Sequence, residues 1–233
     1  MIDFQAIILA AGCGTRMNLN TENIPKCLLH VGKKTILDRQ IDILLKNGIK
    51  DILIVTGYKS DLIKKYLFKK NIKIIYNKNY KKYDNLFSIW SVKDFIKTDF
   101  ICIYGDLIFN EKLLSSFLQS STSSLIVDKP LHVYDSHSVI IKESLIKNIN
   151  FDTKKYAPSG QFIGILKFND DSIDLFKKSL DFFYQNNDLN GEFVRLIKFL
   201  LDKIDIHAFP IKQNIWINVN DRKKYEIAKN LFA

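Results

Sequence analysis

The stretch Leu9-Ala10-Ala11-Gly12-Cys13-Gly14-Thr15-Arg16-Met17, followed after a polar loop by Pro25-Lys26, organises the rest of this chain. The apolar run that leads into it, from Phe4 to Leu9, predicts a strand buried on both faces. The small residues after this strand let successive backbone N–H groups face an anion or a nucleobase edge. Arg16 adds a guanidinium suited to bidentate contact with phosphate oxygens, and Lys26 adds an ammonium. The stretch therefore predicts a loop that binds a triphosphate.

Two common glycine-rich motifs do not fit this loop. The dinucleotide-binding pattern G-x-G-x-x-G needs glycine at position 17, where the chain has Met17. A Walker loop needs Gly-Lys-Ser/Thr at a fixed spacing, and none follows. An incidental glycine-rich turn between a strand and a helix is the structural alternative that stays open.

Strands and helices alternate along the first half of the chain. After the first strand, apolar residues at helical spacing predict a helix from Thr35 to Leu45, and Ser60 is expected to cap a second helix through Lys69. Further strands are expected at 51–55, 72–76 and 100–104. This order predicts a Rossmann-like three-layer α/β/α fold whose mixed central sheet is mostly parallel. A small β meander is expected as an insertion over 131–151.

Composition sets limits on the class of protein. With 233 residues and 47% hydrophobic content, the chain is expected to form one domain over 1–233. The net charge of +10 is mostly lysine, with only four arginines among the 35 basic residues, so we expect attraction for anionic substrates and no nucleic-acid partner. The three cysteines lack C-x-x-C spacing, and no signal peptide or membrane span is recognised, which favours a reducing cytoplasm and no membrane partner.

A carboxylate follows the fourth expected strand. Asp106 comes directly after Gly105, past the buried run 100–104, where an acidic side chain can hold a divalent cation against a triphosphate. Asp is also a common turn residue, which is the alternative interpretation. His132 and His137 have no spacing typical of a metal site and are interpreted as surface or packing residues.

Several segments resemble one enzyme superfamily. The Leu-Ala-Ala-Gly-x-Gly-Thr-Arg-Met run with its Pro-Lys resembles the signature of nucleotidyltransferases that make nucleoside-diphosphate-activated sugars and alcohols, and Tyr104-Gly105-Asp106 resembles their metal motif. The segment from Asn77 to Ile89 and the run 191–194 resemble bacterial phosphocholine cytidylyltransferases and related enzymes that load CMP onto small phosphorylated amines or phosphonates. The run 160–165 resembles a Gly-Glu-Phe-Ile-Gly-Ile segment of that family, with Gln161 in place of the glutamate.

The resemblance implies roles for particular residues. Lys26 and Arg16 would be catalytic, with Lys26 at the attacked phosphate and Arg16 on the phosphates that leave. The nucleotide would contact Leu9, Ala10, Ala11, Gly12, Gly14, Thr15, Arg16, Lys26, Asn85, Ser88 and Gly105. Mg²⁺ would be the cofactor, held by Asp106 and Asn220, with Asp221 as the alternative to Asn220. The acceptor would contact Tyr83, Gln161 and Glu192.

Structural alternatives stand beside some of these roles. Asp84 can simply cap the helix that follows while Phe87 and Trp90 pack in the core. Glu192 can be a first-turn glutamate favoured by a helix dipole.

The resemblance also implies the substrates. CTP would be the donor and the acceptor would be a small phosphorylated amine, amino acid or phosphonate, such as a phosphocholine-like, 2-aminoethylphosphonate-like or phosphoglutamine-like compound. The product would decorate a capsule or lipopolysaccharide. A sugar-1-phosphate nucleotidyltransferase using UTP, dTTP or GTP is the alternative enzyme, and a basic module that binds RNA or anionic membrane is the non-enzymatic one. The sequence leaves the oligomeric state open, a homodimer included.

Overall fold

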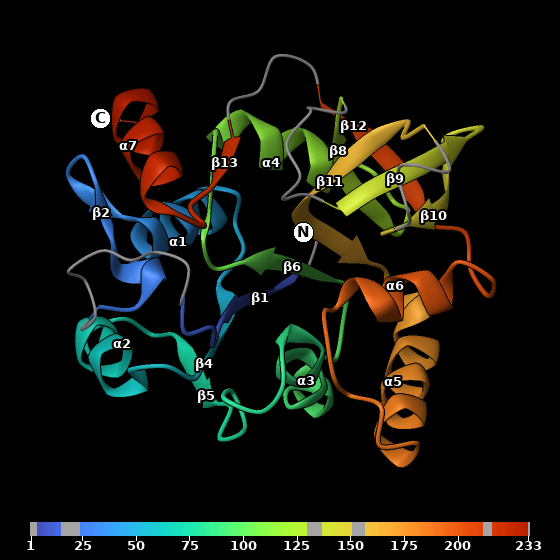
Figure 1. Cartoon of the computed structure of the whole chain (residues 1–233), viewed down its shortest axis with the longest axis horizontal. Coiled ribbons are helices and arrows are strands. Elements are labelled where there is room, and N and C mark those ends of the chain that lie inside the picture. The colour runs from blue at the N-terminus through green and yellow to red at the C-terminus, as the bar shows by residue number, and fades with distance from the viewer. Residues whose placement is uncertain (1–3, 15–23, 130–136, 151–156, 212–215, 233) are drawn as a thin grey trace.

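The computed structural model describes residues 4–14, 24–129, 137–150, 157–211 and 216–232, and its centre is one nine-stranded sheet (Figure 1). The strands are β1 (Gln5–Ala10), β4 (Asp51–Thr56), β5 (Lys73–Tyr76), β6 (Phe100–Tyr104), β8 (Ser124–Asp128), β9 (His137–Lys142), β10 (Leu145–Ile149), β11 (Gly160–Phe168) and β12 (His207–Pro210). Their order is β5-β4-β1-β6-β11-β8-β12-β10-β9. Strands β5, β4, β1 and β6 are parallel, and β11 is antiparallel to both β6 and β8. The predicted mixed, mostly parallel sheet is confirmed.

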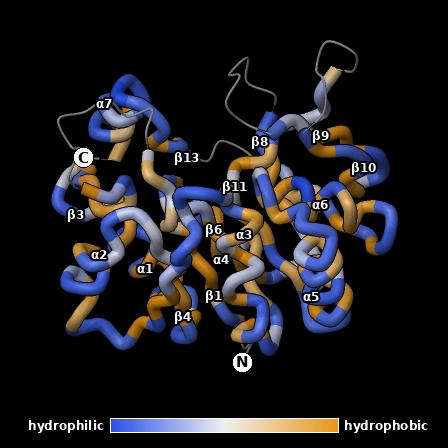
Figure 2. Tube along the Cα trace, turned by 60° about the horizontal axis from the view of Figure 1, so that its bottom comes forward, coloured by the Kyte–Doolittle hydropathy of each residue, from blue (hydrophilic) through white to orange (hydrophobic). Residues whose placement is uncertain are grey.

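Helices cover both faces of this sheet. Helices α1 (Ile36–Lys46), α2 (Ser60–Leu67) and α4 (Glu111–Leu118) pack on one face, and α3 (Asn85–Trp90), α5 (Asp170–Gln185) and α6 (Val194–Leu200) pack on the other. Side chains of a strand alternate between faces, so Ile7 and Leu9 of β1 enter one core while Ala6 and Ile8 enter the other. Figure 2 shows hydrophobic residues concentrated along the central strands. This arrangement is the predicted three-layer α/β/α fold.

Helix boundaries differ from the expectations in two places. The first predicted helix is present, and the Thr35 side chain caps α1 by accepting from the Asp38 N–H at 3.0 Å. The expected capping role of Ser60 is wrong, because Lys59 precedes α2 in the left-handed region (φ 50°) and the Ser60 hydroxyl is hydrogen bonded to Thr56 Oγ1 at 2.7 Å. The second predicted helix, α2, ends at Leu67 instead of the expected Lys69. On the other face, α3 ends at Trp90 and a short 3₁₀ turn follows at Lys93–Phe95.

The predicted insertion is a β-hairpin that closes one end of the sheet. Its described part consists of β9 and β10, which are antiparallel. One edge of β11 has two partners: its first residues pair with β9, and its later residues pair with β6. The pairings β11 with β8, β8 with β12, β12 with β10, β10 with β9 and β9 with β11 thus form a closed ring of five strands.

A small unit with its own core lies at the opposite end of the molecule from β9 and β10 (Figure 1). It contains the hairpin β2 (His30–Val31) and β3 (Lys34–Thr35), the strand pair β7 (Leu107–Phe109) and β13 (Trp216–Asn218), and the terminal helix α7 (Arg222–Leu231). Its buried residues are Leu29, Val31, Ile36, Ile108, Val219 and Ala228. Leu29 follows the 3₁₀ turn Lys26–Leu28, and Val219 precedes Asn220, so this core brings two distant segments of the chain to the end of β6.

In the ranges given above, no helix has both the length and the apolar composition that a bilayer crossing requires.

Candidate active site

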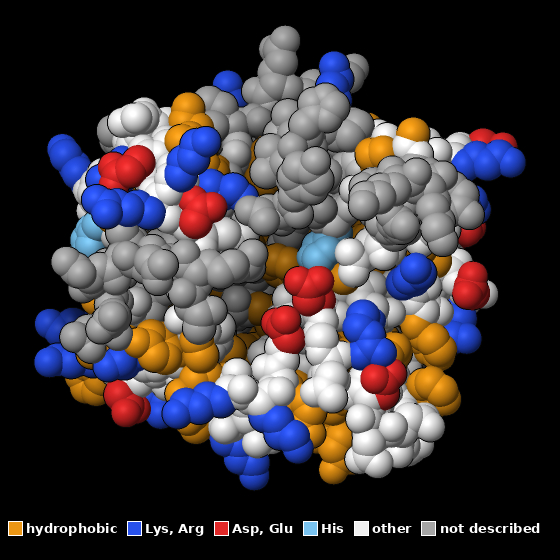
Figure 3. Space-filling model, in the orientation of Figure 1, with side chains coloured by type: hydrophobic (Ala, Val, Ile, Leu, Met, Phe, Trp, Pro, Cys, Tyr) orange, Lys and Arg blue, Asp and Glu red, His pale blue; other side chains and the backbone are white. Residues whose placement is uncertain are grey.

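A cleft of about 650 Å³ opens where β1, β5 and β6 end and β11 begins. The carboxyl ends of parallel strands form the edge at which open α/β sheets bind ligands. Figure 3 shows a hollow in this face of the molecule, with a histidine and acidic side chains at its edge. The described residues that line the cleft include 9–14, Lys26, 80–85, Ser88, 104–106, His137, 162–164, Glu192, Asn218 and Asn220.

Close backbone approach shapes the loop after β1. The Gly105 N–H donates to the Leu9 carbonyl at 2.9 Å, and a Cβ at Gly105 would lie only 2.7 Å from that oxygen. Gly14 has a φ of +64°, and a Cβ there would lie 2.8 Å from Cε of Lys26. A side chain at either position would therefore separate the loop from its neighbours, and glycine lets the stem of Lys26 lie against it.

Lys26 donates hydrogen bonds to two side chains from distant parts of the chain. Its Nζ lies 3.3 Å from Oδ2 of Asp106 and 3.2 Å from Oδ1 of Asn220. The backbone holds these partners together, because the Val219 N–H donates to the Asp106 carbonyl at 2.8 Å. The side chains of Lys26 and Asp106 are only 17% and 24% exposed, so water screens this pair less than it would an open surface pair. The structure thus brings together three residues that the sequence analysis assigned to one reaction centre.

The same two oxygens fit the donor set of Mg²⁺. A carboxylate oxygen of Asp106 and an amide oxygen of Asn220 are hard ligands, and they already converge on one cation, the Lys26 ammonium. Among the described residues, no group of three or more His, Cys, Asp and Glu side chains is placed to hold a metal ion. A magnesium ion held by Asp106 and Asn220 would therefore need further ligands from phosphate oxygens and water.

Asp221, the alternative to Asn220, has another role. Its carboxylate accepts from the Lys224 N–H at 2.8 Å and caps α7. It is also absent from the lining of the cleft. The geometry therefore favours Asn220 over Asp221 as the partner of Asp106.

The segment before and within α3 lines one wall of the cleft. Ser88 is buried, and its hydroxyl accepts from Nδ2 of Asn77 at 3.0 Å. Asn85 accepts the Phe193 N–H through its amide oxygen. Tyr83 stacks on Phe87 with ring centroids 4.7 Å apart. The polar groups of Asn85 and Ser88 therefore hold the wall together, and their predicted contacts with the nucleotide stay predictions.

The structural interpretation of Asp84 and its neighbours agrees with the observed contacts. Asp84 caps α3 by accepting from the Asn85 N–H at 2.7 Å, while Phe87 is buried and Trp90 packs against the same core. Asp84 nevertheless also lines the cleft.

Three predicted site residues are not among the described residues that line the cleft. Thr15 and Arg16 fall outside the described residues. Gln161 is 2% exposed on β11 and does not line the cleft, whereas the next residues, 162–164, do. Its predicted contact with the acceptor gains no support from this position.

Glu192 lies at the rim of the cleft, two residues before α6 begins at Val194, so it is not a first-turn residue of that helix. Its carboxylate is 3.7 Å from Nε2 of His137. His137 was interpreted as a surface or packing residue, and the structure instead places it in the lining of the cleft. No sequence pattern identifies this histidine. It reaches the cleft because β9 pairs with β11, a strand far from it in the sequence.

Burial keeps two ionisable groups of the site neutral. Burial raises the pKa of the Cys27 thiol, next to Lys26 in the chain, to about 12. It also raises the pKa of the Tyr104 phenol well above its ordinary value, and the nearby Cys102 and Glu192 act in the same direction. Neither group is expected to serve as a nucleophile or base near neutral pH.

The fold and the cleft together define a doubly wound α/β protein with a glycine-lined loop and a lysine–carboxylate pair at the carboxyl ends of its strands. The profile of the MobA-like NTP transferase domain matches residues 6–149, more than half of the chain, and the chain belongs to this family. The predicted nucleotidyltransferase family is therefore confirmed.

Curated relatives carry more specific names. The chain is 32% identical over 121 residues to the choline-phosphate cytidylyltransferase of Streptococcus pneumoniae, a match that covers 52% of this chain and 53% of that one. It is 29% identical over 185 residues to the CTP:phosphoglutamine cytidylyltransferase of Campylobacter jejuni, covering 70% and 72% of the two chains. The matched stretch thus spans about half of the first relative's length. Sugar 1-phosphate nucleotidyltransferases are also among the relatives.

A solved structure of the CTP:phosphocholine cytidylyltransferase from Streptococcus pneumoniae has the same fold. Its TM-score is 0.88 at 21% sequence identity, with 100% of both chains covered. At 21% identity this similarity shows that the two proteins share a fold and nothing more specific.

Proposed function

We propose that this chain is a CTP-dependent cytidylyltransferase that transfers CMP to a small phosphorylated amine, amino acid or phosphonate and releases pyrophosphate. The product would supply a capsule or lipopolysaccharide with its head group. The observation that carries the proposal is the convergence of Lys26, Asp106 and Asn220 beside the loop 9–14. The names of two relatives, a choline-phosphate and a phosphoglutamine cytidylyltransferase, support CTP and this acceptor class.

The proposed reaction needs no strong base. An oxygen of the acceptor's phosphate attacks the α-phosphorus of CTP, and pyrophosphate leaves from the opposite side. The second pKa of a phosphomonoester is about 6, so the attacking group is largely ionised near neutral pH. Catalysis then consists of positioning the two phosphates and neutralising their charge.

The residues of the cleft suit this task. In the proposal the Lys26 ammonium moves onto the attacked phosphate, and backbone groups of Ala10 to Gly12 contact the base. Arg16 would hold the β- and γ-phosphates. Asp106 and Asn220 would hold Mg²⁺, which supplies Lewis-acid stabilisation of charge on the phosphate oxygens. The proposed partners are CTP and the acceptor, with no nucleic acid or membrane partner.

Pyrophosphate release tests the proposal. CTP, UTP, dTTP and GTP are each combined with phosphorylated amines, amino acids, phosphonates and sugar 1-phosphates in the presence of Mg²⁺. We expect turnover with CTP and an amine-bearing acceptor. Turnover confined to UTP, dTTP or GTP with a sugar 1-phosphate would instead establish the alternative enzyme, which the sugar nucleotidyltransferase relatives keep open.

Two lysine variants, one inside the cleft and one outside it, test the catalytic role of Lys26. Lys26→Ala is expected to lower kcat by about 10²–10³-fold, the usual effect of removing one group that stabilises transition-state charge. The matched control is Lys46→Ala, which removes an exposed lysine paired with Glu111 at 2.6 Å outside the cleft and should keep full activity. Both variants should unfold at the same temperature as the parent, within a few degrees. A fully active Lys26→Ala protein would refute the role of this lysine.

A further inference from the structure

Glu192 and His137 face each other across one end of the cleft. Nε2 of His137 lies 3.7 Å from Oε2 of Glu192, and their side chains are 17% and 47% exposed, respectively. Pairs with this degree of exposure contribute only about 0–1 kcal/mol to stability. A contribution to stability therefore does not explain why a carboxylate and an imidazole lie together at the rim of the cleft. Contact with a ligand explains their position better.

The backbone on both sides of Glu192 is fixed to α3. The Leu86 N–H donates to the Gly191 carbonyl at 3.3 Å, and the Phe193 N–H donates to the side chain of Asn85. Gly191 has a φ of +90°, which allows the sharp turn before Glu192. The carboxylate is thus carried on a short segment anchored at both ends to the wall that also lines the cleft.

His137 occupies the place where a cation could stack on an aromatic ring. It lies opposite Phe162 in the register of β9 and β11, and the two rings stack with centroids 6.4 Å apart. Tyr104 and Phe162 form an edge-to-face pair with ring centroids 5.9 Å apart, and Phe162 is only 1% exposed. Phe162 is therefore covered and offers a ligand no open ring face, whereas the His137 imidazole and the Glu192 carboxylate beside it line the cleft.

We infer that Glu192 and His137 bind the head group of the acceptor, and that this head group carries a primary ammonium. The inference rests on the proposed function. A primary ammonium can donate N–H hydrogen bonds to the Glu192 carboxylate, and the negative charge of Asp84, which also lines the cleft, adds to the attraction for a cation. A quaternary ammonium has no N–H to donate to these acceptors, and the buried ring of Phe162 beside them gives it no open aromatic face.

Three acceptors of matched size test this inference. Phosphoethanolamine has the primary ammonium, phosphocholine differs from it by three N-methyl groups, and 2-hydroxyethyl phosphate replaces the ammonium by a neutral hydroxyl. Binding of each compound to the full chain is measured by titration calorimetry without nucleotide, and kcat/KM is measured with CTP. We expect phosphoethanolamine to exceed both others by about tenfold or more in each measurement.

A carboxamide variant links the preference to one residue. Glu192→Gln should reduce the preference for phosphoethanolamine over 2-hydroxyethyl phosphate to about one, through the KM of the acceptor, with the KM of CTP unchanged. The control is Glu111→Gln, which removes an exposed carboxylate outside the cleft and should keep the full preference. His137→Gln should weaken phosphoethanolamine severalfold by removing the imidazole that faces Glu192.

The results distinguish a failure of this inference from a failure of the proposed function. Equal or tighter binding of phosphocholine, or an unchanged preference in Glu192→Gln, would overturn the inference while the protein still turned over CTP. Absence of turnover with every nucleotide and acceptor would refute the proposed function, and the calorimetric comparison would still decide whether Glu192 binds an ammonium. Tight binding of 2-hydroxyethyl phosphate would also overturn the inference.

Discussion

Lys26 holds a position that a metal ion would also favour. Its ammonium lies within 3.3 Å of the Asp106 carboxylate and the Asn220 amide oxygen, and Asp106 is the only acid of the three residues. The formal charges of Lys26 and Asp106 cancel, so the ligand-free site offers little attraction for a second cation. We therefore expect the metal to enter together with the phosphates of the nucleotide, which supply the missing negative charge.

The consequence can be measured with Mn²⁺, whose free and bound forms differ in their paramagnetic resonance signal. Lys26→Met removes the competing ammonium and should make Mn²⁺ bind the ligand-free protein about tenfold more tightly, although turnover falls. Asn220→Asp should act in the same direction by adding a charge to the site. An equal or weaker Mn²⁺ affinity in both variants would show that Lys26 and the ion do not share these oxygens.

Residues of the site differ in how readily the sequence reveals them. Lys26 and Asp106 could be predicted because each follows a local pattern, a proline after a glycine loop and a Gly-Asp after a buried strand. His137 could not, because its place in the cleft depends on the pairing of β9 with β11, which no local pattern encodes. Gln161 was assigned to the acceptor by resemblance alone, and it is absent from the lining of the cleft.

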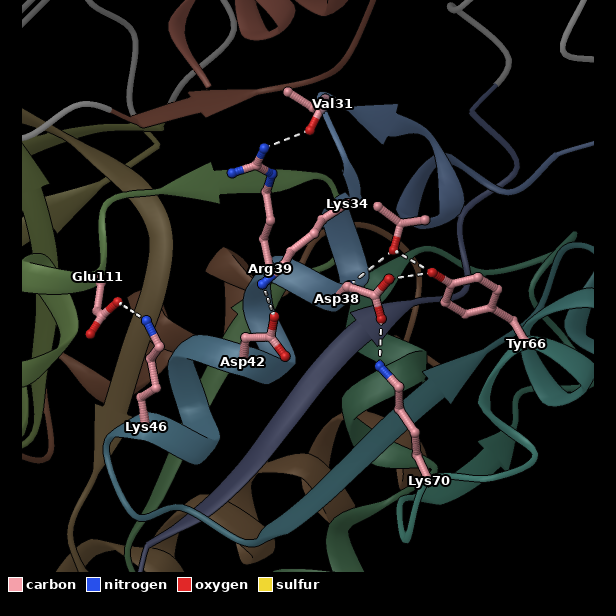
Figure 4. Close-up of polar contacts among 10 residues, drawn as sticks. Val31, Lys34, Asp38, Arg39, Asp42, Lys46, Tyr66, Lys70 and Glu111 are labelled. Carbon is pink, nitrogen blue, oxygen red and sulfur yellow. Dashed lines mark hydrogen bonds and ion pairs between the residues drawn. The ribbon is translucent and has the colours of Figure 1, made fainter. Parts of the chain in front are cut away.

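At the scale of elements, α1 is the support of the small unit that carries Lys26 and Asn220. Figure 4 shows polar side chains of this helix reaching Val31 of the hairpin β2–β3, Tyr66 of α2 and Glu111 of α4. Arg39 donates to the Val31 carbonyl on β2 and to the Phe232 carbonyl after α7. One partly buried guanidinium therefore links the hairpin that follows the Lys26 turn to the helix that follows Asn220.

Replacing Arg39 should loosen this unit first. Arg39→Met leaves two carbonyl groups without their donor, which we expect to lower the free energy of unfolding by about 1–3 kcal/mol. Hydrogen exchange should accelerate in α7 and in 26–31, with β4 and α2 unchanged. The control beside the same helix is Lys34→Met, because Lys34 lies just before α1 and forms an exposed ion pair with Asp42. Its loss should lower the free energy of unfolding by less than about 0.5 kcal/mol. Uniform acceleration across the sheet in Arg39→Met would contradict a local role.

Element types follow from local chemistry more reliably than their caps do. The apolar spacing of 36–45 predicted α1, and Thr35 caps it as its residue type favours. The same logic failed at Ser60, because a neighbouring Thr56 hydroxyl competes for the serine side chain. The short strands β2, β3 and β13 were not predicted, since two or three residues carry no periodic signal and their core is built from segments far apart in the chain.

At the scale of the whole molecule, the doubly wound half could be predicted and the other half could not. Alternating strands and helices predict parallel strands joined by right-handed crossovers, and β5, β4, β1 and β6 are parallel to one another. The ring of β11, β8, β12, β10 and β9 depends on pairings between residues far apart, such as Leu145 with His207. Sequence periodicity indicates that these segments are strands and leaves their partners open.

Strand β11 joins the two halves, and every one of its nine residues is buried, Lys167 included. The Lys167 ammonium donates to the Phe117 carbonyl at 2.9 Å and to the Ser120 carbonyl at the end of α4. Burial nevertheless disfavours its charge and lowers the pKa from 10.5 to about 8, with Asp99 opposing the change. An ionisable group at the junction of the two halves makes the stability of the whole chain depend on pH.

The sign of this dependence follows from proton counting. Between about pH 8 and 10.5 the unfolded chain keeps the proton on Lys167 while the folded chain loses it, so the free energy of unfolding rises with pH through that window. Relative to Lys167→Met, which cannot titrate there, the parent should gain up to about 3 kcal/mol between pH 7 and 10.5, because a tenfold difference in proton affinity corresponds to about 1.4 kcal/mol. Urea unfolding at several pH values measures the gain, and a constant cost of losing the two carbonyl contacts cancels in the difference. The control Lys178→Met removes an exposed lysine of α5, and its stability should follow the same dependence on pH as the parent. Parallel curves for the parent and Lys167→Met would show that burial does not lower the pKa of Lys167.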